Sequence, residues 1–186
     1  MRELSLNIMD VVQNSITAGA SMMKILIVED LKADEMSIDI IDNGSGMTEE
    51  QVKQVIDPFY TTRTTRSVGL GVPLFKMEAE MTGGTFEINS KLGEGTELKA
   101  LFKPSSVDMV PLGDINSTVQ LLITCNPERD FIFERTLITA NGEKKDFSLK
   151  TEELREVLGE EVPLSTPDVA LWIKEFLSES TNELYS

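Results

Sequence analysis

Apolar residues recur at two different spacings along the first hundred residues, and the spacing separates helices from strands. Between residues 2 and 18 they recur at about the helical period, which predicts a helix that ends at Gly19. Residues 25–29 and 37–41 alternate between apolar and polar side chains, which predicts two strands joined by a charged turn. The apolar positions of the helix are Leu4, Ile8, Val11, Val12 and Ile16.

Turn and capping signals divide the next sixty residues. Thr48 followed by Gln51 is typical of a capping box and predicts a helix that runs to about Ile56. Residues 60–68 are rich in threonine and arginine without apolar periodicity, and we expect a mobile loop there. A helix is predicted over residues 72–81, with Pro73 in its first turn, followed by an antiparallel strand pair over residues 85–90 and 96–103.

A stretch at Lys103-Pro104-Ser105-Ser106 is the best candidate for a domain boundary. It divides the chain into residues 1–103 and a C-terminal extension of residues 104–186. In the extension, Asp114 is positioned to cap a helix that ends near residue 124. The pair Asn141-Gly142 predicts a hairpin of residues 131–139 and 145–149, and helices are expected over residues 151–158 and after Pro167.

The composition narrows the partners and the compartment. The net charge is −15, with −6 in residues 1–103 and −9 in residues 104–186, which argues against nucleic acid or an anionic membrane as the main partner. The single cysteine, Cys125, fits a reducing cytoplasm and is expected to be a buried thiol. No apolar run approaches the roughly 20 residues of a membrane helix. The absence of histidine from the sequence excludes catalysis or autophosphorylation on histidine.

Five short blocks carry the candidate chemistry. The Asp-Asn-Gly-Ser-Gly block that starts at Asp42 is by itself also ordinary turn chemistry. Taken together and in their order, the five blocks resemble the nucleotide-binding domain of the GHKL ATPases, which include gyrase, the heat-shock chaperone, histidine kinases and MutL. The resemblance covers about residues 1–103. The blocks are residues 10–15, 42–47, 57–63, 68–72 and 93–96.

The resemblance implies a fold, two ligands and a set of site residues. The fold is an α/β two-layer sandwich, the Bergerat/GHKL ATP-binding fold, with a mixed sheet, helices on one face and a small α+β C-terminal extension. The ligands are ATP and Mg²⁺, and the stretch between the third and fourth blocks is the lid over the nucleotide. The residues implied in binding ATP are Asn14, Asp42, Gly44, Gly46, Tyr60, Thr62, Arg63, Gly69, Leu70, Gly71 and Thr96.

Four of these positions have implied individual roles. Asp42 accepts a hydrogen bond from the adenine amine, and Thr96 donates to the water or carboxylate beside adenine. Asn14 binds Mg²⁺ through its side-chain oxygen. Asp10 matches the family's catalytic glutamate, which acts as a general base, but it is one methylene shorter, so slow turnover is expected.

Three functional classes remain open on the sequence. We expect a cytoplasmic Mg-ATP-binding regulatory protein, most similar to a stand-alone histidine-kinase-like protein kinase that phosphorylates a partner protein. The alternatives are an ATPase or ATP-gated switch, and a nucleotide-binding regulatory subunit without turnover. A homodimer is left open.

Trp172 and Phe176 share a helix face, and we expect burial against the hairpin rather than a partner groove. The methionines, including Met77 and Met81, are expected to pack in the interior.

Overall fold

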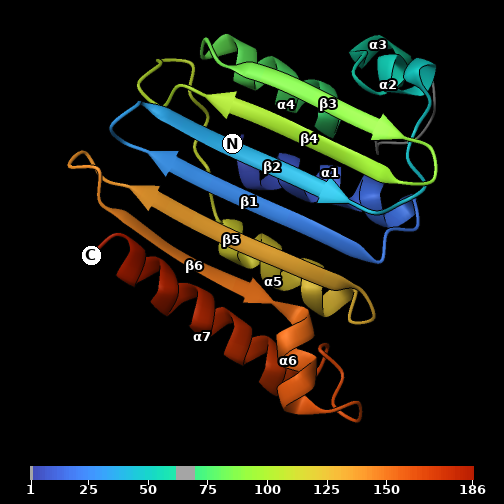
Figure 1. The fold of residues 1–186 in the computed structure, drawn as a ribbon, viewed down its shortest axis with the longest axis vertical. Helices are drawn as coiled ribbons and strands as arrows, with labels where there is room; N and C mark the ends of the chain where they lie inside the picture. Colours follow the sequence, from blue (N-terminus) through green and yellow to red (C-terminus); the bar gives the residue numbers. More distant parts are fainter. Residues whose placement is uncertain (1, 62–69) are drawn as a thin grey trace.

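Six strands form one mixed sheet in the computed structural model, which describes residues 2–61 and 70–186. The strand order is β3-β4-β2-β1-β5-β6 (Figure 1). β1 and β5 run parallel, and every other neighbouring pair is antiparallel. The strands are β1 (Met22–Asp30), β2 (Glu35–Asp42), β3 (Thr85–Lys91), β4 (Gly95–Phe102), β5 (Asp130–Ile138) and β6 (Lys144–Lys150).

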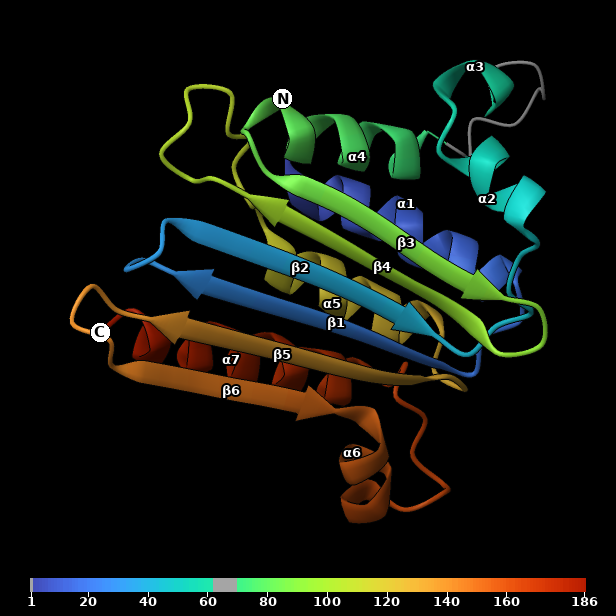
Figure 2. The same ribbon diagram turned by 45° about the horizontal axis from the view of Figure 1, so that its top comes forward.

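The long helices cover one face of this sheet. Figure 2 shows α1, α4, α5 and α7 behind the strands, with α6 at the end of β6 and α2 and α3 beside the β3 edge. The expected α/β sandwich with helices on one face is therefore confirmed. The helices are α1 (Leu4–Thr17), α2 (Glu49–Val55), α3 (Pro58–Thr61), α4 (Gly71–Met81), α5 (Ile115–Cys125), α6 (Thr151–Leu158) and α7 (Pro167–Leu184).

The alternation of the strands explains how the sheet is covered on one side. Ile25 and Ile27 of β1 and Ile38 of β2 are at most 1% exposed and face the helices. The residues between them face the open side and are partly exposed. Successive side chains of a strand point to opposite faces, so one apolar set per strand builds the core against α1 and α4.

Two predicted helix starts are confirmed by capping hydrogen bonds. The Thr48 side chain accepts from the Gln51 amide, and the Gln51 side chain accepts from the Thr48 amide, which completes the capping box of α2. The Asp114 carboxylate accepts from the Ser117 amide at the start of α5. Each contact satisfies backbone donors that have no partner within the helix.

Three expectations of the sequence need correction. Residues 60 and 61, assigned to a loop, belong to the short helix α3; the rest of the predicted mobile loop lies outside the described residues. Cys125, expected to be buried, is exposed because it is the last residue of α5, beyond the buried stripe. Met77 and Met81 are 39% and 53% exposed, because α4 turns Phe75 and Ala79 toward the core instead.

The C-terminal extension shares the sheet of the N-terminal part. β5 pairs with β1 along its whole length, so residues 130–150 add two strands to the same sheet. The connector before α5 also holds the start of α1, because the amides of Leu4 and Ser5 donate to the carbonyls of Pro111 and Leu112 at 2.9 Å each. A division at residues 103/104 stays a prediction, and the two parts have one continuous backbone hydrogen-bond network.

The end of α7 is fixed to the sheet by contacts around the buried Arg135. Arg135 of β5 is 3% exposed and donates to Glu29 of β1 and to the Tyr185 hydroxyl at 2.5 Å each. Burial and a hydrogen bond to Glu29 raise the pKa of Tyr185 to about 12. These contacts hold the C-terminal end of α7 against β1 and β5.

A buried polar pair links α1 to α4. The Asn7 side-chain amide donates to the Glu78 carboxylate, and the two residues are 8% and 3% exposed. Burial raises the pKa of Glu78, while nearby Arg2 and the Asn7 hydrogen bond act in the opposite direction. The protonated form of Glu78 is therefore favoured by folding.

We expect Glu78→Gln to flatten the pH dependence of stability. The raised pKa means that folded Glu78 keeps a proton which the unfolded chain loses near the ordinary glutamate pKa of 4.5. Wild-type stability therefore falls as the pH rises from 4.5 through the pKa of the folded state. Glutamine keeps the acceptor for Asn7 and has no proton to lose. Urea unfolding at several pH values measures the free energy of unfolding of both proteins. The variant should become more stable relative to the wild type as the pH rises.

Glu78→Leu is the matched control for the hydrogen bond. It removes the charge and the acceptor together, which leaves the Asn7 amide buried without a partner at a cost of about 1–3 kcal/mol. If leucine is tolerated as well as glutamine, the Asn7–Glu78 bond contributes nothing to the packing of α1 on α4.

Candidate functional site

A cavity of about 330 Å³ lies between α1 and the neighbouring strands β2 and β4. The loop after β2 and the helix α2 also line it. Its size is at the low end of the range for small-molecule sites, and its walls are mostly apolar with a few polar groups. The apolar walls include Val11, Ile40, Val72, Ile88 and Leu98, and the polar groups include Asn14, Ser15, Asp42, Gln51 and Thr96.

Asp42 is the last residue of β2, and its carboxylate is held at the cavity from two sides. The Ser15 hydroxyl of α1 donates to Oδ2 at 2.6 Å, and the Gly44 amide donates to Oδ1 at 2.8 Å. Each carboxylate oxygen has two lone pairs, so both keep capacity for a donor from the cavity. The carboxylate is therefore fixed in orientation and remains an acceptor for a ligand.

Thr96 lies beside Asp42 because β2 and β4 pair in that register. Its hydroxyl lies 2.8 Å from the hydroxyl of Ser90 on β3, and the Ser90 hydroxyl accepts from the Met47 amide at 2.8 Å. The Ser90 hydroxyl also lies 3.1 Å from the Gly95 carbonyl, to which it can donate. Ser90 thus connects the loop after β2 to the hairpin of β3 and β4 and positions the Thr96 hydroxyl at the cavity.

Two glycines bring backbone segments into contact around Asp42. At Gly46, with φ of +70°, an added Cβ would lie 2.0 Å from the Lys91 carbonyl oxygen. At Gly95, with φ of +120°, an added Cβ would lie 2.0 Å from the Asp42 carbonyl oxygen. The sequence predicts close approach to a ligand at Gly44 and Gly46; the structure shows that Gly46 approaches the backbone of the β3–β4 hairpin.

Asn14 and Asp10 lie one turn apart on α1. Asn14 lines the cavity. Asp10 is exposed, is not among the residues that line the cavity, and lies next to Gly71 at the start of α4. Partial desolvation raises the pKa of Asp10 above its ordinary value. Asn14 thus offers a neutral oxygen at the cavity, and the Asp10 carboxylate lies beyond the cavity wall.

Two predicted site residues lie at the start of α4, and four others are not described by the structure. Leu70 precedes α4, and Gly71 begins it against Asp10. The side chain of Tyr60 and residues Thr62, Arg63 and Gly69 lie outside the described part of the chain.

Ser15 and Ser90 are site residues that the sequence did not reveal. Ser15 is 4% exposed and follows Leu4, Ile8, Val11 and Val12 on the buried stripe of α1. A hydroxyl on an otherwise apolar stripe needs a buried partner, and that signal could have identified it. Ser90 has no such signal, because its position depends on the register of β3 and β4.

The described residues contain no group of three or more histidine, cysteine, aspartate or glutamate side chains arranged to hold a metal ion. Asn14 supplies one neutral side-chain oxygen at the cavity. That fits Mg²⁺ bound mainly by phosphate oxygens and water, since this ion keeps several waters in protein sites.

Comparisons with known proteins agree with this geometry. A family model described as "Histidine kinase-, DNA gyrase B-, and HSP90-like ATPase" matches residues 2–106. A protein of Shewanella frigidimarina described as a sensor protein is 30% identical over 103 residues, which are 54% of this chain and 16% of the relative. The signal transduction histidine-protein kinase ArlS of Staphylococcus aureus is 30% identical over 96 residues, which are 49% of this chain and 21% of the relative.

A solved structure extends the comparison beyond the family match. The N-terminal domain of a DNA repair protein is similar with a TM-score of 0.56 at 15% identity, and the match covers 86% of this chain and 58% of that one. This coverage exceeds residues 2–106, so part of the C-terminal extension also follows the neighbour's fold. The curated relatives are much longer than the matched segments, which span only about a fifth of their length.

We expect Gly71→Ala to destabilise the protein. An added Cβ would lie 2.6 Å from the Cβ of Asp10, an atom too close to the backbone of α1 to move aside. Overpacking of this kind costs about 1–3 kcal/mol, whereas helix propensity alone would stabilise an alanine by up to about 1 kcal/mol. The sign of the change in the free energy of unfolding, measured with urea, therefore shows whether overpacking or helix propensity dominates. A stabilised variant would mean that α4 does not depend on close contact with Asp10.

Proposed function

The chain belongs to the family of histidine kinase-, DNA gyrase B- and HSP90-like ATPases, and we propose that it binds Mg-ATP in the cavity between α1 and the sheet and transfers the γ-phosphate to a partner protein. The observation that carries this proposal is the Asp42 carboxylate, held by Ser15 and Gly44 at the end of β2. None of the helices in the described part of the chain is long and apolar enough to cross a membrane.

Base recognition follows from the chemistry of Asp42 and its surroundings. A carboxylate is an acceptor only, and the exocyclic amine of adenine is a donor. The apolar walls, including Ile40 and Leu98, suit the flat faces of a purine. Because Ser15 and Gly44 already fix the two oxygens, little ordering of the carboxylate remains to be done on binding.

The phosphate end of the ligand is assigned to α1. Asn14 supplies one oxygen to a Mg²⁺ ion that arrives with the triphosphate, and the ion would neutralise charge on the phosphate oxygens. Asp10, one turn earlier, is the candidate general base for the attacking hydroxyl. Its raised pKa makes it a stronger proton acceptor than an ordinary aspartate.

The acceptor of the phosphate belongs to another protein. The sequence contains no histidine, so a histidine acceptor would have to be supplied by a partner; a serine acceptor is the other candidate. The histidine kinase among the relatives supports phosphotransfer as the reaction. Fold similarity alone does not establish it, since one fold serves several reactions.

Incubation with γ-labelled ATP and Mg²⁺, alone and with the products of neighbouring genes, tests the proposal. Label on a partner protein supports the kinase. Release of free phosphate without a labelled partner identifies an ATPase or ATP-gated switch instead. Tight nucleotide binding with neither product identifies a regulatory subunit and contradicts the proposed transfer.

We expect Asp42→Asn to weaken ATP binding by roughly 10–150-fold, because loss of one hydrogen bond to a charged group typically costs about 1.5–3 kcal/mol. ITP, which carries a carbonyl in place of the adenine amine, should lose far less affinity, since the asparagine amide can donate to that carbonyl. Titration calorimetry with both nucleotides measures the two losses.

Asp39→Asn is the matched control for this experiment. Asp39 lies on the same strand but on the open face of the sheet, away from the cavity. Unchanged ATP affinity in Asp42→Asn, or an equal loss in Asp39→Asn, would contradict the assignment of base recognition to Asp42.

We expect Asp10→Asn to lower phosphotransfer or hydrolysis by about 10²–10⁴-fold while ATP affinity stays within a few-fold. Because the active form of a general base is deprotonated, wild-type activity should rise with pH through the pKa of Asp10, which lies above 3.8. The variant should lack this rise. Asp10→Glu tests whether the aspartate side chain is too short to reach the attacking hydroxyl. If its length limits the rate of phosphotransfer or hydrolysis, glutamate should maintain or raise that rate. A fully active Asp10→Asn would show that the base lies elsewhere.

A further inference from the structure

β6 forms an open edge of the sheet. It pairs with β5 on one side and is the last strand in the order (Figure 1). In the part of the chain that the structure describes, no strand pairs with its outer side. An exposed strand edge is a template for an extended segment of another chain.

An apolar groove of about 760 Å³ borders the second half of this edge. It lies between Ser148–Lys150 of β6, the helix α6 and the first half of α7. Val157 of α6 is 86% exposed and Trp172 of α7 is 46% exposed, so large apolar side chains face the solvent there. The expected burial of Trp172 against the hairpin is therefore wrong for this residue, while Phe176 does pack on Phe147.

The aromatic side chains of the groove are held in place by one another. The Trp172 and Phe176 rings stack at 5.1 Å with 12° between their planes, and Phe176 contacts the Phe147 ring edge-on at 6.3 Å. Phe147 in turn contacts the buried Phe133. An exposed aromatic that is already ordered loses little freedom on binding and is a typical anchor of an interface.

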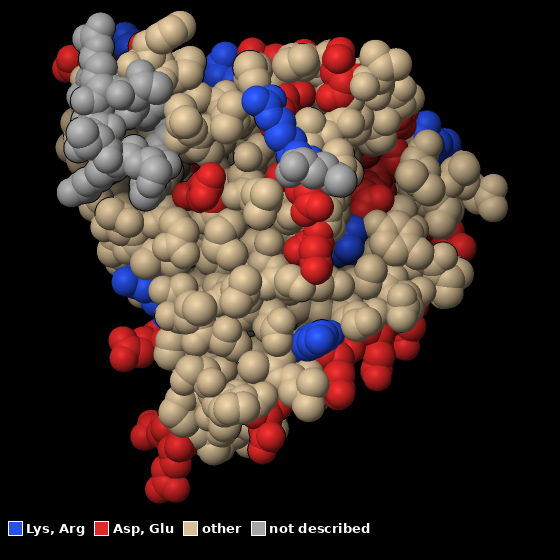
Figure 3. Space-filling view, turned by 180° about the vertical axis from the view of Figure 1, so that it is seen from behind, with Lys and Arg blue, Asp and Glu red and all other residues tan. Residues whose placement is uncertain are grey.

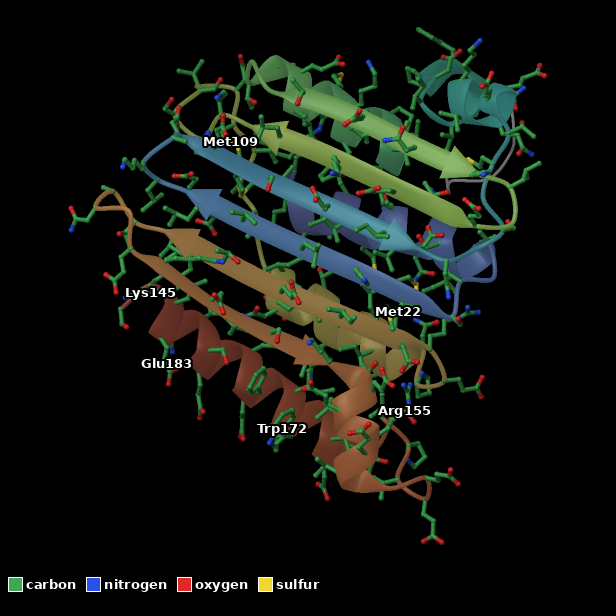
Figure 4. All side chains as sticks on the ribbon, in the orientation of Figure 1. Met22, Met109, Lys145, Arg155, Trp172 and Glu183 are labelled. Carbon is green, nitrogen blue, oxygen red and sulfur yellow. The ribbon has the colours of Figure 1, made fainter. Side chains whose placement is uncertain are left out.

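α7 extends past the outer edge of β6 on the helix-covered face of the sheet. Figure 1 shows α7 beyond the line of β6, and Figure 2 shows it behind the sheet. Figure 4 shows Trp172 on this outer part of the helix. A strand added outside β6 would lie over α7, and every second side chain would point into the groove toward Trp172.

The surroundings of the groove define the charge of its occupant. Residues 151–186 contain nine acidic and two basic residues, a net charge of −7. Glu153 and Asp168 line the groove together with Lys150. With β6 included, residues 144–186 contain ten acidic and five basic residues, a net charge of −5, so the acidic surface is that of α6 and α7. Figure 3 shows acidic side chains along the lower margin of the molecule, where α6 and α7 lie. A second copy of this acidic surface would be repelled, whereas a basic segment would be attracted.

We propose that an extended segment of a partner protein, with apolar residues at alternate positions and Lys or Arg on both flanks, binds as an added strand on the outer edge of β6. Its backbone pairs with residues 147–150, its apolar side chains enter the groove beside Trp172 and Val157, and its basic flanks face the acidic residues of α6 and α7. This inference rests on residues of β6, α6 and α7, and it holds independently of the nucleotide chemistry.

Trp172 is the only tryptophan of the chain, so its fluorescence reports the groove directly. The probe is the synthetic peptide acetyl-KKVTVSVKK-amide, titrated into the full chain. We expect a saturable blue shift of Trp172 emission. Val157→Ser should weaken binding at least about tenfold through loss of apolar contact. Leu171→Ser is the matched control, because Leu171 is 53% exposed next to Trp172 but outside the groove, and binding should be unchanged.

Two modified peptides test charge and strand pairing separately. Replacement of the four lysines by glutamate should abolish binding. N-methylation of alternate amides should abolish binding in one of the two alternating sets and preserve it in the other, because only one set faces β6. No saturable shift at millimolar peptide, equal binding of the acidic peptide, or tolerance of both N-methylated sets would overturn the proposal. A concentration-dependent dimer whose formation shifts Trp172 emission without peptide would also overturn it, since a second copy would then occupy the groove.

Discussion

The contact between the loop after β2 and the hairpin of β3 and β4 is the constraint on which the candidate site depends. At Gly46 and Gly95 the two segments approach so closely that a Cβ would overlap a carbonyl oxygen of the other segment. The same contact brings Asp42 and Thr96 side by side at the ends of their strands. Because the approach is backbone to backbone, the position of the carboxylate is set by the fold of the sheet, and Ser15 and Gly44 then fix its orientation.

The C-terminal extension contributes to this scaffold through the sheet and through α1. β5 joins the edge of β1, and the connector before α5 satisfies amides in the first turn of α1. The helix that carries Asp10, Asn14 and Ser15 is therefore held at one end by residues outside the family match. A partner on β6, as proposed above, would contact the same continuous sheet at the opposite edge from β3, and nucleotide and protein would then occupy separate surfaces.

The sequence predicted those helices and strands whose periodicity and capping residues are local. The helix around Leu4 and Ile8, the alternating strands, the Thr48 capping box and the Asn141-Gly142 hairpin all depend on neighbours within a few residues. Ser90 could not be predicted as a site residue, because its role follows from strand register. Cys125 is exposed because it ends α5, and Trp172 is exposed because of the side of α7 that meets the sheet; composition decides neither. The roles of Asp10, Asn14, Asp42 and Thr96 came from the resemblance and stay predictions. The structure adds hydrogen bonds at Asp42 and Thr96, and it places Asn14 at the cavity and Asp10 outside the cavity lining.

A crystal structure of the chain with a non-hydrolysable ATP analogue and Mg²⁺ tests the central claim most directly. The account predicts that the adenine amine lies within about 3 Å of an Asp42 carboxylate oxygen, with Ser15 and Gly44 still bound to that carboxylate and Mg²⁺ beside Asn14. An analogue bound elsewhere, or bound in this cavity with its adenine amine directed away from Asp42, would contradict it.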